Sequence, residues 1–144
     1  MQFGDPTTIT WSIVPDGTPN AAEGPSDLIS TMDAIFGSGP GGNDLAQRPW
    51  FGFYEQAFDR WAQLSGLSYV YEPNDDGVIS SSDTNVGVLG VRGDVRIAGS
   101  FQDGNSGVLA FNFFPNNGDM TIDTGDVNII GDSTNNYRAF RNIL

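Results

Sequence analysis

The chain contains no cysteine, no histidine and no lysine. Without cysteine it can form neither a disulfide bond nor a thiolate zinc site. Without histidine it lacks the commonest general base and zinc ligand, so Ser–His–Asp and Cys–His catalysis cannot be built from these residues alone. No apolar run is long enough to span a bilayer, and the first residues lack the basic and apolar regions of a signal peptide. We therefore expect any signal peptide to have been removed or not included.

Acidic residues dominate the charge. There are 18 of them against six basic residues, all arginine, and the net charge is −12. This balance argues against binding to nucleic acid or to an anionic membrane, and it permits bound calcium. The alternative is a solvated acidic surface. Richness in Gly, Asn, Asp, Ser and Thr without Lys or Cys is compatible with a secreted, extracellular bacterial protein.

The length of 144 residues and a hydrophobic content of 38% predict one globular domain, residues 1–144. Apolar periodicity and turn residues predict five strands, at residues 7–15, 67–73, 93–100 and 106–115 and a short one within 118–126. Helices are predicted from a Ser26 cap to Phe36, from Pro49 to Leu64 with Gly66 after it, and from a cap at Asn135 and Asn136 to Leu144. The segment after the fifth strand is expected to be loop until that last helix. This order suggests a twisted sheet with helices on one side.

The helix from Pro49 to Leu64 is the clearest element. Its aromatic and apolar side chains recur at helical spacing, and we expect this stripe to be buried in the core: Phe51, Tyr54, Phe58, Trp61 and Leu64. A role in packing is the interpretation we adopt for these residues.

The segment GDVRIAGSFQDGNSGVLAFNFFPNNGDMTIDTGD, Gly93 to Asp126, resembles the matrixin branch of the metzincin zinc endopeptidases. The upstream ITWSIVP and AFDRWAQLSGLSYVYEP segments fit the same family, closest to its secreted bacterial members. The resemblance implies an α+β fold. It would be the upper subdomain of a zincin, with a twisted, mostly parallel five-stranded sheet, an antiparallel edge strand and helices on one side.

In that family the last helix runs into H-E-x-x-H-x-x-G-x-x-H, which supplies the zinc ligands and the general base. The resemblance implies that this chain is the N-terminal part of such a catalytic domain, truncated just before that motif and inactive alone. Three alternatives remain open: a complete protein that ends in a helix, a non-catalytic secreted calcium-binding or adhesion domain, and a glycan-binding β-sandwich. The helix at Pro49 to Leu64 argues against the last.

The family's calcium loop is the best transfer to this sequence. The resemblance implies a calcium site made by Asp103, Gly104, Ser106, Asp123 and Asp126. Carboxylates plus carbonyls suit a cation that takes six to eight oxygens. The alternative is a plain turn with solvated acids. A second site at Asp94 and Asp119 is a weaker hypothesis, because the loop between Pro115 and Gly118 is shorter than in the family.

The family's structural zinc does not transfer, because its ligand positions correspond to Arg96, Ala98, Phe111 and Thr121. We expect no zinc ligand in this chain, and we expect Phe111 to fill the space of a liganding imidazole.

Substrate binding is expected along the fourth strand. In the family a peptide pairs antiparallel with this strand, at positions that correspond to Gly107, Val108, Leu109 and Ala110. The alternative is an ordinary core or edge strand. The expected partners are a peptide substrate and either the missing C-terminal part or a second copy of the chain.

Overall fold

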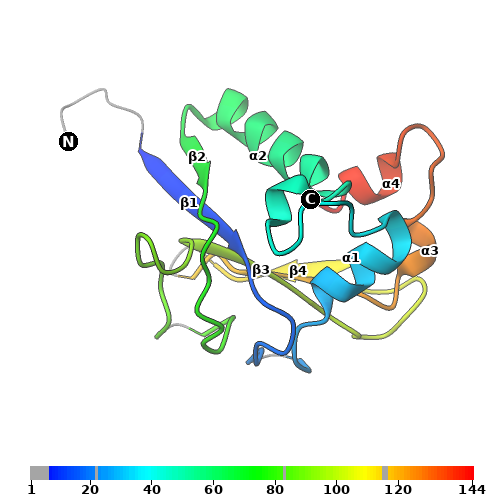
Figure 1. Cartoon of the computed structure of the whole chain (residues 1–144), viewed down its shortest axis with the longest axis horizontal. Coiled ribbons are helices and arrows are strands. Elements are labelled where there is room, and N and C mark those ends of the chain that lie inside the picture. The colour runs from blue at the N-terminus through cyan, green and yellow to red at the C-terminus, as the bar shows by residue number, and fades with distance from the viewer. Residues whose placement is uncertain (1–6, 22, 83, 115–116) are drawn as a thin grey trace.

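The computed structural model describes residues 7–21, 23–82, 84–114 and 117–144 (Figure 1). Its strands are β1 (Thr8–Ile13), β2 (Ser68–Tyr71), β3 (Val95–Ser100), β4 (Ala110–Asn112) and β5 (Met120–Asp123). Its helices are α1 (Leu28–Phe36), the 3₁₀-helix η1 (Leu45–Gln47), α2 (Phe51–Ser65), α3 (Val127–Ile130) and α4 (Arg138–Arg141).

The five strands form one sheet in the order β2-β1-β3-β5-β4. The pairs β1–β2, β1–β3 and β3–β5 are parallel, and β4 pairs antiparallel with β5. Parallel neighbours need a crossover connection, and α1, η1 and α2 supply it between β1 and β2. The predicted α+β class, with a mostly parallel sheet and an antiparallel edge strand, is confirmed.

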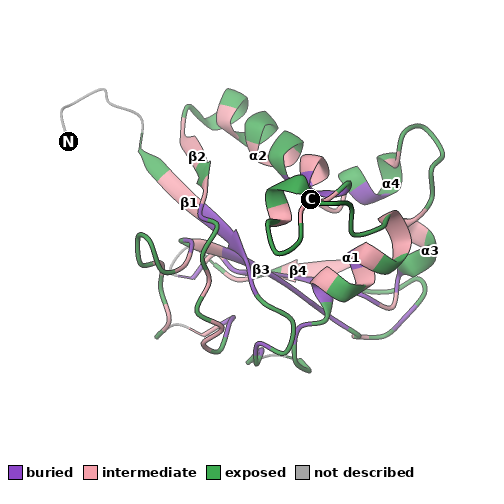
Figure 2. Cartoon of the chain, in the orientation of Figure 1, coloured by how far each residue is buried: buried purple, intermediate pink, exposed green. Residues whose placement is uncertain are grey.

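The apolar core lies between the sheet and the helices. Trp11 of β1 stacks on Phe51 and Phe58 of α2, with ring centroids 5.4 and 4.5 Å apart. Leu28 and Met32 of α1 are fully buried in the same cluster. As expected, the alternation in β1 directs Trp11 and Ile13 toward this cluster. Figure 2 shows the buried residues concentrated in the central strands and in the helix turns that face them.

The opposite face of the sheet is polar. Ser12, Arg96 and Thr121 are buried there under loop residues rather than under helices. Ser12 Oγ donates to Asp75 Oδ2 at 2.7 Å, and Asn20 Nδ2 donates to Thr121 Oγ1 at 2.8 Å. Hydrogen bonds therefore satisfy Ser12 and Thr121 on this face, whereas Ser100 Oγ is buried without a partner among the described residues.

The long helix α2 agrees with its prediction at both ends, and Gly66 ends it in the left-handed conformation at φ 71°. Its predicted buried stripe is wrong at its C-terminal half. Trp61 is 55% exposed and Leu64 is 64% exposed. Both side chains line a cleft and take no part in the buried core cluster.

Strand β4 is shorter than the predicted strand at residues 106–115, and β3 begins at Val95 rather than at Gly93. One hydrogen bond and one backbone conformation explain why β4 begins late. Val108 donates its N–H to Asp103 Oδ2 at 3.1 Å, and Ser106 adopts a left-handed φ of 70°. Residues 106–108 are therefore folded into the preceding loop.

The predicted caps of two helices are wrong. At α1 the N-cap residue is Asp27, and the carboxylate of Asp16, from a distant loop, accepts the N–H groups of Ile29 and Ser30 at 2.9 and 2.8 Å. Ser26 Oγ instead accepts the N–H of Gly99 at 3.3 Å.

The C-terminal region also differs from the prediction. Helix α3 occupies a segment that we expected to be loop, and α4 spans only Arg138–Arg141. Asn135, Asn136 and Tyr137 have φ values of 52°, 57° and 56°. Asparagine tolerates this left-handed conformation, so the two asparagines make a turn in place of the expected cap.

Candidate functional site

The loop before β4 is built around the carboxylate of Asp123, at the end of β5. Its Oδ1 accepts the N–H groups of Gln102 and Gly125 at 3.0 and 2.7 Å. Its Oδ2 accepts those of Asp103 and Gly104 at 3.2 and 3.1 Å. Asp123 is fully buried, so these four bonds replace its hydration.

The same contacts set the protonation of Asp123. Burial by itself would raise the pKa of this carboxyl, but the N–H groups of Gln102, Gly125, Asp103 and Gly104 outweigh it and lower the pKa. The carboxylate is therefore the favoured form in the folded protein.

Asp126 connects the same loop to the start of α3. Its Oδ1 accepts the N–H of Ser106 at 3.0 Å. The residue is fully buried, yet Oδ2 has no hydrogen-bond partner among the described residues. A buried carboxylate oxygen without a donor is costly unless a cation or water satisfies it.

Asp103 lies directly beneath Gly107. A Cβ on Gly107 would lie 2.3 Å from Asp103 Oδ2, so a larger residue there would require the Asp103 carboxylate to move. The Oδ1 of Asp103 takes part in none of the hydrogen bonds of the described residues, and the residue is exposed. This side chain thus has coordination capacity left.

The structure brings together all five residues of the predicted calcium site, through hydrogen bonds of the loop to Asp123 and Asp126. Among the described residues, no three acidic side chains are grouped as in a metal site. The backbone satisfies Asp123, whereas Asp126 Oδ2 and Asp103 Oδ1 remain as oxygen donors. Hard oxygen ligands of this kind are the ones that calcium takes, and the calcium site stays a prediction.

The outer side of β4 is one of the two edges of the sheet, and β2 is at the other. Leu109 O accepts the N–H of Asp123 at 2.9 Å, and Phe113 N–H donates to Asp119 O at 2.9 Å. In an antiparallel ladder alternate residues bond to the neighbouring strand. The backbone groups of Ala110 and Asn112 therefore point away from β5.

The four predicted substrate-binding residues occupy different surroundings. Ala110 lies in β4, and Leu109 precedes it with its carbonyl turned toward β5. Gly107 and Val108 belong to the loop over Asp103, and the N–H of Val108 is already bonded. Asn112, which the sequence analysis did not select, has its backbone on the open edge with Ala110.

The proposed second calcium pair is not joined by a hydrogen bond among the described residues. Asp94 Oδ2 accepts from the N–H and the hydroxyl of Thr10 at 2.8 and 2.9 Å. Asp119 is buried and accepts the N–H groups of Ser81 and Arg96 at 2.7 and 3.0 Å. Burial raises the pKa of the Asp119 carboxyl despite these bonds. Each acid thus has a structural partner of its own, and the second site stays a prediction.

Arg96, one of the four residues that we expected not to ligate zinc, forms a buried ion pair. Its Nη2 is 2.6 Å from Asp75 Oδ1, and both side chains are almost completely buried. The guanidinium also donates to the carbonyls of Val78 and Ile79 at 2.9 and 3.3 Å. Arg96 of β3 thus binds the loop after β2 to the polar face of the sheet. A single arginine in a strand gave no sequence signal for it.

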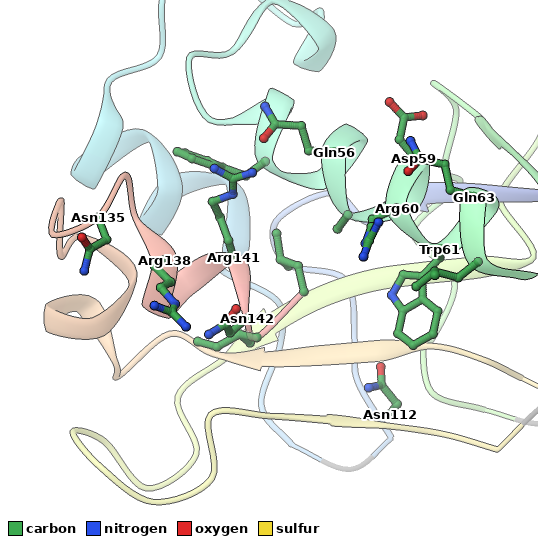
Figure 3. Close-up of a pocket in the computed structure, with 15 residues that line it drawn as sticks. Gln56, Asp59, Arg60, Trp61, Gln63, Asn112, Asn135, Arg138, Arg141 and Asn142 are labelled. Atoms are coloured by element: carbon green, nitrogen blue, oxygen red, sulfur yellow. The ribbon is translucent and has the colours of Figure 1, made fainter.

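A cleft between α2 and the segment around α4 was also missed by the sequence analysis. It has a volume of about 830 Å³, and its lining comes mainly from α2 and from the segment around α4. Figure 3 shows Arg138 and Arg141 on one side of it, Arg60 and Trp61 across from them on α2, and Asn112 on β4 below. Helical periodicity assigned Trp61 to the core, and for this reason the sequence analysis did not predict the cleft.

No helix in the described parts of the chain has the length and apolarity needed to cross a membrane. No protein-family model matches the chain, and no curated protein or solved structure matches it either.

Proposed function

We propose that the chain is the substrate-binding, N-terminal part of the catalytic domain of a secreted, zinc-dependent metalloendopeptidase of the matrixin type. One observation carries the proposal: β4 is a short antiparallel edge strand whose Ala110 and Asn112 backbone groups point outward. An extended peptide adds to such an edge by main-chain hydrogen bonds, which grip many sequences alike. Pockets beside the strand would then select side chains.

Calcium is the cofactor for which the chain itself offers ligands. Asp103 and Asp126 would hold it, with backbone carbonyls of the loop at Gly104 and Ser106. The ion would satisfy Asp126 Oδ2 and neutralise acids that repel each other. It would stabilise the loop that leads directly into β4, and so the edge on which the substrate lies.

Zinc finds no ligand set in these residues, since the chain has no histidine or cysteine. The proposal therefore requires the zinc ligands and the general base to come from outside residues 1–144. The role of this chain in the reaction is to bind and orient the peptide. We expect the chain alone to have no peptidase activity.

The test compares this chain with the longer product of the same gene, in a fluorogenic-peptide assay with zinc and calcium. We expect turnover only from a product that carries an H-E-x-x-H segment. Turnover by the pure 144-residue chain, or a gene that encodes no such segment, would defeat the proposal.

A variant of the edge strand tests the substrate site in the active product. Ala110→Pro removes one outward N–H without removing a bond to β5, so we expect KM to rise about tenfold, the effect of a lost hydrogen bond. Ala110→Gly keeps the N–H and is the matched control. Equal KM values for the two variants would show that the peptide does not pair with β4.

The second candidate is a non-catalytic, secreted calcium-binding or adhesion domain. The buried, unpartnered Asp126 Oδ2 favours calcium in either case. A gene without a zinc motif, together with retained calcium binding, would decide for this candidate.

A further inference from the structure

Half of the arginines in this acidic chain form no ion pair with the residues that the structure describes. Three of them form ion pairs: Arg48 with Asp33, Arg92 with Asp76 and Arg96 with Asp75. The side chains of Arg60, Arg138 and Arg141 form no hydrogen bond or ion pair with any residue in the described ranges. With 18 acidic residues available, so many unpaired guanidinium groups call for an explanation.

All three unpaired arginines line the cleft between α2 and α4 (Figure 3). Among the described residues that line the cleft, Asp59 is the only one with an acidic side chain. Two of the arginines lie in the last turn of α4, where they also favour the helix dipole. That explanation does not reach Arg60, which lies within α2. The cleft is therefore a local cationic surface on a strongly acidic molecule.

An apolar pocket of about 230 Å³ adjoins the cleft. Trp61, Ala57 and Leu144 line both the pocket and the cleft. Tyr54 also lines the pocket, and its buried hydroxyl has no hydrogen-bond partner among the described residues. A buried hydroxyl without a partner costs free energy, which a ligand atom in the pocket would recover.

We propose that this cleft binds an acidic peptide segment of a partner protein, with one aromatic side chain of that segment in the pocket beneath Trp61. Arg60, Arg138 and Arg141 pair with the carboxylates of the segment, as guanidinium groups do in planar, two-bonded contacts. The aromatic side chain serves as the buried anchor of the contact. The remaining surface repels an acidic segment, which confines it to this cleft.

This inference does not rest on the proposed peptidase function, because it concerns only the described surface of the present chain. It can be tested without zinc or turnover.

The probe is a fluorescein-labelled acidic peptide of Glu and Asp with a single central Tyr. Its binding is measured by fluorescence anisotropy at physiological ionic strength. We expect it to bind at least about tenfold more tightly than the same peptide with Ser in place of Tyr. The triple variant Arg60→Gln/Arg138→Gln/Arg141→Gln is expected to bind at least about tenfold more weakly. Glu55→Gln, an exposed change on α2 outside the cleft, is the matched control and keeps full affinity. Equal unfolding temperatures would show that the variants are folded.

Three results would overturn the proposal. The first is no binding of the acidic Tyr peptide, and the second is equal affinity for the wild type and the triple variant. The third is another occupant of the cleft. A dimer that sedimentation detects in the wild type but not in the triple variant would assign the cleft to a second copy. Loss of peptide binding in a longer gene product with an H-E-x-x-H segment would assign it to that segment.

Discussion

At the scale of single residues, two buried charged side chains hold the loops on which the candidate site depends. Arg96 holds the loop after β2, and Asp123 holds the loop before β4. Each is surrounded by partners from segments distant in sequence. Their roles can be separated by substitutions that keep the size of the side chain.

Arg96→Met is expected to lower the free energy of unfolding by about 3–5 kcal/mol, because it leaves Asp75 buried without its counterion. Urea unfolding followed by tryptophan fluorescence measures this change. The more exposed pair Arg92–Asp76 gives the control, and Arg92→Met should cost about 1 kcal/mol or less. Equal costs for the two variants would show that the buried pair has no special role.

Asp123→Asn is expected to destabilise the protein at neutral pH by about 3 kcal/mol, since an amide nitrogen would then face two of the four N–H donors. The pH dependence has a definite sign. The folded-state pKa of Asp123 lies below the ordinary aspartate value of 3.8, so its stabilisation is present above that pH and is lost as the pH falls through the folded pKa.

The measurement is the urea midpoint from about pH 7 to about pH 3 in EGTA. The wild type should lose stability on the acid side, and Asp123→Asn should lose less there. Asp119 acts in the opposite direction: its raised pKa means that protonation on acidification favours the folded state. Asp59→Asn, which takes no part in these contacts, controls for net charge. Parallel acid limbs for the wild type and Asp123→Asn would refute the assignment.

At the scale of elements, the loop of residues 101–108, β4 and the start of α3 form one unit. The N–H of Ser106 donates to Asp126, and the N–H of Val108 donates to Asp103. Asp123 accepts the N–H of Gly104 in the same loop. Whatever stabilises this unit also fixes the edge strand, because Leu109 is bonded to Asp123 through its carbonyl.

Calcium is expected to raise the unfolding temperature of the chain. At about 100 times its dissociation constant it would add about 2.7 kcal/mol of stability. Asp126→Asn should abolish the increase, because it removes the unpartnered buried oxygen, whereas Asp94→Asn tests the second site separately. Differential scanning calorimetry with calcium, magnesium and EGTA makes the measurement. An unchanged unfolding temperature in calcium and EGTA would exclude the site.

Elements with strong local patterns could be predicted from sequence, and those that depend on distant partners could not. Helix α2 and its Gly66 end follow from spacing and from a residue that tolerates positive φ. The start of β4 depends on the contact of Val108 with Asp103, and the capping of α1 depends on Asp16. Helical spacing could name the stripe of α2 but not how far the sheet extends beneath it, so Trp61 was misplaced.

At the scale of the whole molecule, the surplus of acidic groups is the dominant electrostatic feature. A net charge of −12 on 144 residues produces self-repulsion in the compact state. The cationic cleft is the local exception to this field.

Sodium chloride is therefore expected to raise the unfolding temperature steadily as it screens this repulsion, with calcium absent. The destabilisation by Arg96→Met should change little with salt, because that pair is buried and poorly screened. Thermal unfolding across a salt series, in EGTA, tests both statements. An unfolding temperature that falls with salt would mean that attractive surface pairs outweigh the repulsion.

The sequence by itself determined most of the elements and their order, because alternation and helical spacing act over short stretches of chain. The class of the sheet and the acids of the loop before β4 were expected only from the resemblance to the matrixins. Only the tertiary structure decided which carboxylates remain unsatisfied, which strand edge stays open and where the free arginines gather. Those properties arise from contacts between segments far apart in the chain, and local sequence patterns do not predict such contacts.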